Sequence, residues 1–193
     1  MDSSSEGNSD NSNNFDAAQE MLADGIFDFS IPFLPETLPS VLQVGSGTDF
    51  LSLDIESLFP AQHDLLDKDE NHLKIARQQL ASFFPNAKYR LLQGEAETLD
   101  TDDRYDLIYS ISLEDISDLK AFIQRAASWL KPSGRIFLGA FSSATTEKEL
   151  TALVTCAGLT VLDSATSQYT EENATTDCTR ELFIIGAEKE AKK

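Results

Sequence analysis

The chain has 193 residues, the size of one domain, and its 41% hydrophobic content, with 12 Phe, can supply a single sizeable core. It carries 33 acidic and 15 basic residues, so the formal net charge is -18, and this negative field opposes binding to nucleic acids and to anionic membrane surfaces. No apolar run approaches the roughly 18 to 20 residues of a membrane span, and the N-terminus has neither the basic nor the apolar region of a signal peptide. We therefore expect a soluble, cytoplasmic protein.

Cysteine and histidine are too few for the usual metal sites. Cys156 and Cys178 are the only cysteines, and their spacing matches neither a disulfide framework nor a metal-binding motif, so we expect two reduced thiols. His63 and His72 are the only histidines. No metal is expected.

The N-terminal region divides into two parts by composition. Residues 1–13 contain Ser, Asn, Asp, Gly, Glu and a single Met, which predicts a disordered acidic tail. Residues 14–37 combine apolar residues at helical spacing with a proline-rich stretch, which predicts an arm or lid over the domain. Its apolar residues could contact a substrate or simply cover the sheet; they are Phe27, Phe29, Ile31, Phe33 and Leu34.

Beyond residue 38, apolar runs alternate with helical periods up to residue 188, before a charged tail at 189–193. The strand candidates are Ser40 to Val44, Gln62 to Leu66, Lys88 to Leu92, Tyr105 to Ser110, Gly134 to Phe141, Thr160 to Ser164 and Glu181 to Ala187. Two amphipathic helices are clearest, with apolar faces of Leu73, Ala76, Leu80, Phe83 and Phe84, and of Leu119, Phe122, Ile123, Ala126 and Leu130. This alternation predicts an α/β fold with a mostly parallel sheet.

A glycine pair directly follows the first strand candidate, in the stretch VLQVGSGTDF. In open α/β sheets, ligands bind beyond the carboxyl ends of the strands, so the loop of Gly45, Ser46 and Gly47 is a candidate nucleotide site. Asp67 ends the second strand, where a carboxylate can accept ribose hydroxyls; alternatively it is a solvated acid at a helix start. A nicotinamide-binding motif would need a third glycine at position 50, where the chain has Phe50.

Four segments in this order resemble the motifs of class I S-adenosylmethionine-dependent methyltransferases. They read VLQVGSGTD, DKDENHLKIARQQL, LLQGEAETL and YDLIYSISLEDISDLKAFIQRAASWLKPSGRIFLG. The resemblance spans about residues 38 to 187. It implies a Rossmann-like three-layer α/β/α sandwich, whose seven-stranded sheet has one antiparallel strand near the C-terminus, and S-adenosylmethionine as the cofactor.

The resemblance also implies which residues contact the cofactor. Gly45, Ser46 and Gly47 would pass under its methionine portion and ribose, and Asp67 would hold the ribose hydroxyls. Lys68 would lie beside the adenine, Glu95 and Ala96 would meet the adenine amino edge, and Ser110 would line the amino-acid end. No catalytic residue follows from the motifs. Glu114 or Asp115 could act as a base, or both could be solvated loop acids.

The chain also departs from the family pattern. Gln43 stands where an acid is usual, Asp49 stands in place of a third glycine, and Glu95 replaces a shorter Asp. Asp49 would take up room near the cofactor, although it also favours the start of the following helix. Two hypotheses therefore remain: an enzyme that methylates a small molecule with S-adenosylmethionine, or an inactive methyltransferase-like domain that binds a protein partner.

Overall fold

The computed structural model describes residues 21–37, 40–45, 51–111, 113–171 and 178–191. Its described part contains one sheet of seven strands in the order β3-β2-β1-β4-β5-β7-β6. The strands are β1 (Ser40–Val44), β2 (Gln62–Asp67), β3 (Lys88–Gln93), β4 (Tyr105–Ser110), β5 (Leu130–Phe141), β6 (Thr160–Glu171) and β7 (Cys178–Glu188). β7 is antiparallel to both of its neighbours, whereas β1 to β5 pair in parallel. The predicted seven-stranded α/β fold is confirmed.

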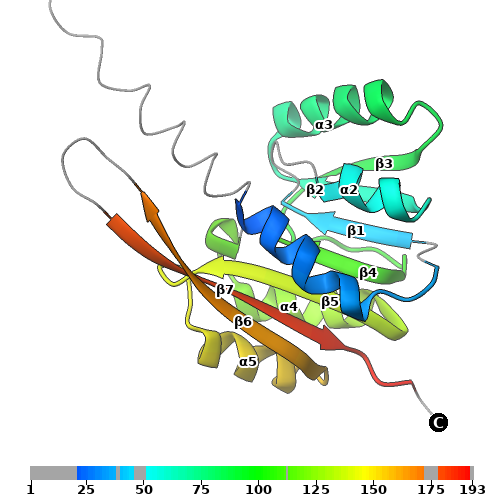
Figure 1. Cartoon of the computed structure of the whole chain (residues 1–193). Helices are drawn as coiled ribbons and strands as arrows, with labels where there is room; N and C mark the ends of the chain where they lie inside the picture. The colour runs from blue at the N-terminus through cyan, green and yellow to red at the C-terminus, as the bar shows by residue number, and fades with distance from the viewer. Residues whose placement is uncertain (1–20, 38–39, 46–50, 112, 172–177, 192–193) are drawn as a thin grey trace, which may run out of the picture.

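Helices cover both faces of this sheet (Figure 1). Residues 21–30, α2 (Leu51–Leu58) and α3 (Glu70–Phe83) lie on one face, and α4 (Leu119–Trp129) and α5 (Glu147–Cys156) lie on the other. Two short 3-10 helices, η1 (Ile31–Phe33) and η2 (Leu113–Asp115), precede β1 and follow β4. Parallel strands are joined by crossover connections. Here α2, α3 and α4 lie in three of these connections and form part of the outer layers of the sandwich.

The fifth strand begins earlier than expected and contains a bulge. β5 begins at Leu130, directly after α4, and not at Gly134. Its register with β4 jumps from Tyr105–Leu130 to Leu107–Arg135, which leaves residues 131–134 as the irregular part. A Cβ atom at position 134 would lie 2.9 Å from the carbonyl oxygens of Lys131 and Tyr105, so this bulge requires a glycine.

The amphipathic pattern of α3 predicts its buried face except at its end. Leu73, Ala76 and Leu80 are buried in one cluster with Leu65 of β2. Phe83 was expected on the same face, but it is 65% exposed. Phe83 is the last residue of the helix and lies outside that cluster, so the helical period of the sequence continues past the apolar surface on which α3 packs.

Helical residues 21–30 form part of the core on the front face. Leu22 and Ile26 are buried over Gly139 of β5, where a Cβ atom would clash with Cδ1 of Ile26. The Ser30 and Tyr109 hydroxyls share a buried hydrogen bond of 2.8 Å, and burial raises the pKa of Tyr109. Of the apolar residues in the predicted arm, Ile31 is 45% exposed, whereas Phe27, Phe29, Phe33 and Leu34 pack partly buried against this cluster.

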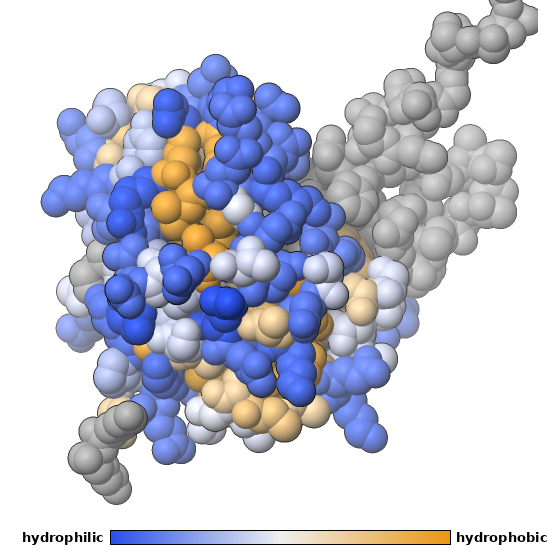
Figure 2. All heavy atoms as spheres, turned by 180° about the vertical axis from the view of Figure 1, so that it is seen from behind, coloured by the Kyte–Doolittle hydropathy of each residue, from blue (hydrophilic) through white to orange (hydrophobic). Residues whose placement is uncertain are grey.

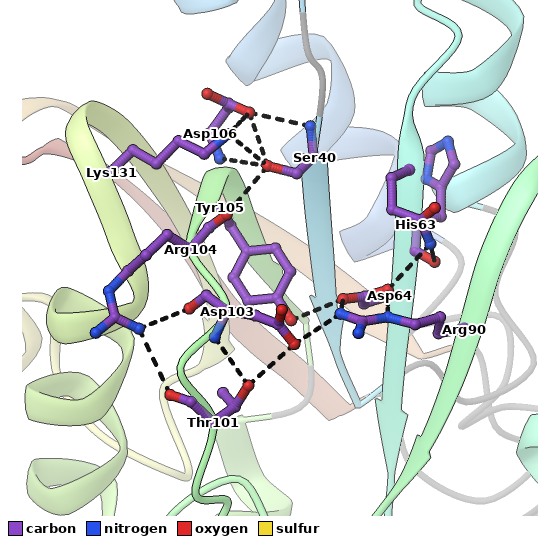
Figure 3. A network of polar contacts seen from close by, with 11 residues as sticks. Ser40, His63, Asp64, Arg90, Thr101, Asp103, Arg104, Tyr105, Asp106 and Lys131 are labelled. Carbon is purple, nitrogen blue, oxygen red and sulfur yellow. Dashed lines mark hydrogen bonds and ion pairs between the residues drawn. The ribbon is translucent and has the colours of Figure 1, made fainter.

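A polar network fills the back of the sheet between β2 and β3, where the β3–β4 connection contains no helix (Figure 3). Asp64 of β2 is 1% exposed, and its carboxylate accepts hydrogen bonds from Nε and Nη2 of Arg90 and, at 2.7 Å, from the Tyr105 hydroxyl. Arg90 also pairs with Asp103 at 2.8 Å. Burial, together with the bond to Asp64, raises the pKa of Tyr105. The charge of Asp64 is therefore fully compensated.

The back face of the molecule is mainly hydrophilic (Figure 2). Figure 2 shows the molecule from behind, with a hydrophobic band among hydrophilic residues. The large hydrophobic side chains that are exposed in the described part of the chain are Met21, Ile31, Leu58, Ile75 and Phe83. None of the described helices is both long enough and apolar enough to span a membrane.

Deletion of residues 1–35 tests the structural role of the N-terminal helix. We expect this deletion to expose apolar surface around Gly139 and Phe137, to lower the melting temperature and to increase binding of a hydrophobic dye. Deletion of residues 1–13 is the control and should change neither measurement. Equal melting temperatures for the two deletions would contradict a core role for residues 21–30.

Replacement of Arg90 tests the polar network. Arg90→Met should lower the free energy of unfolding by about 2 to 3 kcal/mol, because it leaves the Asp64 carboxylate buried with less compensation; fully buried pairs cost more, and the Arg90 side chain is 48% exposed. Arg104→Met is a matched control, since the exposed Arg104 guanidinium hydrogen-bonds only the backbone oxygens of Thr101 and Asp103. Urea denaturation measures both, and equal losses would refute the role assigned to Arg90.

Candidate functional site

Three adjacent strands bring the predicted site residues to one edge of the sheet. Val44 of β1 lies opposite Leu66 of β2 and opposite Ser110 of β4, so the chain leaves all three strands at the same level. The strand order reverses at this point, because β2 and β3 extend to one side of β1 and β4 and β5 to the other. Such a switch point is where open α/β sheets bind ligands.

Gly45, which directly follows β1, has a backbone conformation that favours glycine. Its φ angle is 71°, in the left-handed region, and its backbone N–H donates to the Leu66 carbonyl oxygen at 2.8 Å. A side chain would be strained here, which explains the first glycine of the pair. The loop residues Ser46, Gly47 and Asp49 lie outside the described residues.

Asp67 is held in place at the end of β2. The residue is 7% exposed, and its Oδ1 accepts the Asp69 N–H at 2.8 Å, while Oδ2 lies 3.3 Å from Nδ1 of His72. Its backbone oxygen accepts the Gly94 N–H at 3.0 Å, which connects the ends of β2 and β3. A carboxylate has about four acceptor positions, so this group can accept hydrogen bonds besides these two.

Ser110 contributes an unsatisfied hydroxyl to the same edge. The residue is 0% exposed, and its Oγ has no hydrogen-bond partner within the described part of the chain. A buried hydroxyl without a partner costs about 1 to 3 kcal/mol, so such groups are uncommon and often belong to functional sites.

The loop after β3 carries the other predicted residues. Glu95 is exposed, and its backbone oxygen accepts the N–H groups of Thr98 and Leu99. Ala96 is 6% exposed and packs in the larger hydrophobic cluster. Partial burial alone would raise the pKa of Glu97, but hydrogen bonds from the Ser117 hydroxyl and N–H lower it. Glu97 therefore connects this loop to the segment that follows β4.

An ion pair crosses the same edge. Lys68 Nζ, directly after β2, lies 3.3 Å from Oδ1 of Asp115 in η2 after β4, and both side chains are about half exposed, at 49% and 60%. Because β1 lies between β2 and β4, this pair spans the carboxyl end of β1. The sequence motifs suggested adenine as the neighbour of Lys68 but gave no indication of Asp115, which is 47 residues away.

The two candidate bases both have structural partners. The Glu114 carboxylate accepts the backbone N–H of Phe141 at 2.8 Å, which connects η2 to the end of β5. Asp115 pairs with Lys68.

Gln43, which replaces the usual acid in β1, accepts a hydrogen bond from the Ser52 hydroxyl of α2. Gln43 is 3% exposed, so it contacts the helix after the glycine loop from inside the protein.

A cleft at the opposite end of the sheet has a different character. It has a volume of about 320 Å³ and is lined by Glu56, Pro60, Ala61, Gln62, Asn86 and Lys88, near the amino ends of β2 and β3. Nearby, the buried His63 ring lies 2.8 Å from Glu56, and burial lowers the pKa of His63. None of the predicted site residues lines this cleft. Among the described residues, no group of three or more His, Cys, Asp or Glu side chains could hold a metal ion.

Comparison with known proteins shows which protein family the region around this edge matches. Residues 41–134 match the family model described as "Methyltransferase domain". The sheet order and the helix layers are those of the class I methyltransferase fold. This region matches a methyltransferase domain, and the chain has the Rossmann-like fold of such proteins. It includes β1 to β4, the Gly45 loop, Asp67 and Ser110.

A curated relative and several solved structures are similar to this chain. The chain is 33% identical over 121 residues to the biotin biosynthesis bifunctional protein BioCD of Bordetella avium, and this match covers 62% of the chain but only 24% of that protein's length. A Bacillus halodurans protein provisionally described as a methyltransferase superposes with a TM-score of 0.76 at 14% identity, over 88% of this chain and 99% of its own.

Two further structures share the fold. A SAM-dependent methyltransferase from Methanosarcina mazei has a TM-score of 0.68 at 18% identity, covering 85% of this chain and 98% of its own. The N-methyltransferase NodS of Bradyrhizobium japonicum, in complex with S-adenosylhomocysteine, has a TM-score of 0.68 at 13% identity, with 86% and 85% covered. At these identities the structures support the fold and no particular acceptor.

Proposed function

We propose that this chain binds S-adenosylmethionine at the carboxyl edge of β1, β2 and β4 and transfers its methyl group to a small-molecule acceptor. The observation that carries the proposal is the meeting of Gly45, Asp67 and Ser110 at the switch point of a methyltransferase sheet. Each contributes a different feature: a left-handed turn, an acceptor for hydroxyls, and a buried hydroxyl.

The described residues fit this cofactor. Gly45, directly after β1, has a left-handed conformation and no side chain, so that backbone and ligand can approach closely. The Asp67 carboxylate, held at the end of β2, suits the two ribose hydroxyls as an acceptor, and the hydroxyl of Ser110 offers a donor or an acceptor to the amino-acid end of the cofactor. We assign the adenine to the side of Lys68, Glu95 and Ala96, and the methionine portion to the loop of Gly45, Ser46 and Gly47.

The protein's contribution to the reaction is positioning. S-adenosylmethionine supplies the activated methyl group and the leaving group when it is bound. Glu114 is engaged with the Phe141 N–H and Asp115 with Lys68, so neither carboxylate is poised as a general base. We therefore infer that the acceptor brings its own nucleophilic atom, and that the edge holds this atom in line with the methyl group.

The charge of the chain supports a small acceptor. A net charge of -18 repels nucleic acids, whose phosphates need basic residues at the interface. Two structural relatives are described as N-methyltransferases, and one of them, from Haemonchus contortus, was crystallised with phosphomonomethylethanolamine, a small molecule, at 13% identity to this chain and a TM-score of 0.69. We therefore propose a small-molecule acceptor for this protein, but not that particular molecule.

Titration calorimetry with S-adenosylhomocysteine tests the proposal. We expect the wild type to bind, and Asp67→Ala to weaken binding by about 1 to 3 kcal/mol, because hydrogen bonds to a charged group have this magnitude. Asp102→Ala, which removes an exposed acid from the β3–β4 connection, is the control and should leave the affinity unchanged.

Absence of binding by the folded wild type would contradict the proposal. It would favour an interaction domain that keeps the methyltransferase fold without its cofactor. Gln43 and Asp49, which depart from the family pattern, would be consistent with that outcome.

A further inference from the structure

His72 is an unexpected neighbour of Asp67. It is the third residue of α3, and its Nδ1 lies 3.3 Å from Oδ2 of the Asp67 carboxylate. A carboxylate can only accept at this contact, so Nδ1 must carry the proton of the hydrogen bond. The ring is 42% exposed at its side chain, which leaves it at the border between the buried Asp67 and the solvent.

The position of His72 is fixed by the start of α3. Asp69 caps the helix by accepting the Asn71 N–H at 2.7 Å, and Leu73 and Ala76 are buried at 4% and 7% exposure. The backbone of this first turn therefore cannot shift without disturbing both the cap and the core contacts. His72 consequently presents its ring to Asp67 from a rigid element.

A basic side chain is otherwise unfavourable at this place. The first turn of a helix carries partial positive charge, which disfavours a cationic residue by a few tenths to about 1 kcal/mol. When the ring is protonated, the Asp67 carboxylate, 3.3 Å from Nδ1, offsets this cost. The pairing with Asp67 thus gives a reason for a histidine in the first turn.

The two contacts on Asp67 together fix the plane of its carboxylate. The Asp69 N–H holds Oδ1 at 2.8 Å and His72 Nδ1–H holds Oδ2, so rotation of the carboxylate about its Cβ–Cγ bond would break both. With the plane fixed, the lone pairs of the two oxygens point in defined directions. A ligand with two neighbouring hydroxyls needs such fixed acceptors.

We propose that His72 is a positioning residue, which orients the Asp67 carboxylate to accept the two ribose hydroxyls of the cofactor. The inference rests on the proposed function, since it requires an adenosyl ligand at this edge. It assigns His72 no contact with the reacting atoms. Its role is exerted through Asp67 alone, and this gives the proposal a distinctive signature.

The test compares two ligands in titration calorimetry: S-adenosylhomocysteine and its analogue that lacks both ribose hydroxyls. His72→Ala should weaken S-adenosylhomocysteine about five- to tenfold and leave the affinity for the dideoxy analogue unchanged. His72→Asn, whose side-chain amide can donate from a similar position, should recover most of the loss. Asn71→Ala, the exposed neighbour in the same turn, is the matched control and should change neither affinity.

Equal weakening of both ligands by His72→Ala would overturn the proposal, because it would indicate a general disturbance of the site. An unchanged affinity for S-adenosylhomocysteine would overturn it as well. Failure of the proposed function is a different result: the wild type would not bind S-adenosylhomocysteine, or Asp67→Ala would bind it as tightly as the wild type. Melting temperatures of the variants confirm that each one is folded.

Discussion

The arrangement of the candidate site depends on the position of β1 between two parallel neighbours. β1 is hydrogen-bonded to β2 on one side and to β4 on the other, and it ends at Gly45 in the left-handed region. Because the three strands end at one level, Asp67 and Ser110, 43 residues apart in the chain, are both adjacent to this turn. A different strand order would separate them. The chemistry of the edge is therefore a consequence of the sheet topology.

The polar side chains of the Asp64 network and those of the carboxyl edge differ in their hydrogen-bond partners. Away from the carboxyl edge, Asp64, Arg90, Asp103 and Tyr105 satisfy one another in a network that stabilises the fold where a covering helix is absent. At the carboxyl edge, Ser110 has a buried hydroxyl without a partner among the described residues, and the Asp67 carboxylate is held at the end of β2 by the Asp69 N–H. Among the described residues, the buried side-chain atoms without a partner are Ser110 Oγ, His63 Nδ1 and Glu97 Oε2, and a ligand at the carboxyl edge would compensate for the first of them.

The alternation of apolar runs was sufficient to predict the strands, because each buried strand between amphipathic helices has a distinct pattern. β1 and β4 match their predicted bounds. The bulge at residues 131–134 was missed, since it depends on how Tyr105 pairs with Leu130, which no local pattern encodes. The motifs predicted Asp67 and Ser110 as cofactor-binding residues, and the structure places both at the carboxyl edge. The contacts Asp67–His72 and Lys68–Asp115 could not be predicted, because they depend on side-chain orientations and on the strand order.

Backbone amide NMR during titration with S-adenosylhomocysteine tests the central claim most directly, namely that the ligand site is the carboxyl edge around β1. The account predicts that the largest chemical-shift changes occur at Gly45, Lys68, Ala96 and Ile111, which surround the end of β1. The cleft at the other end of the sheet, with Asn86 and Lys88, should remain unaffected. Largest changes at Asn86 and Lys88, or no changes at saturating ligand, would contradict the account.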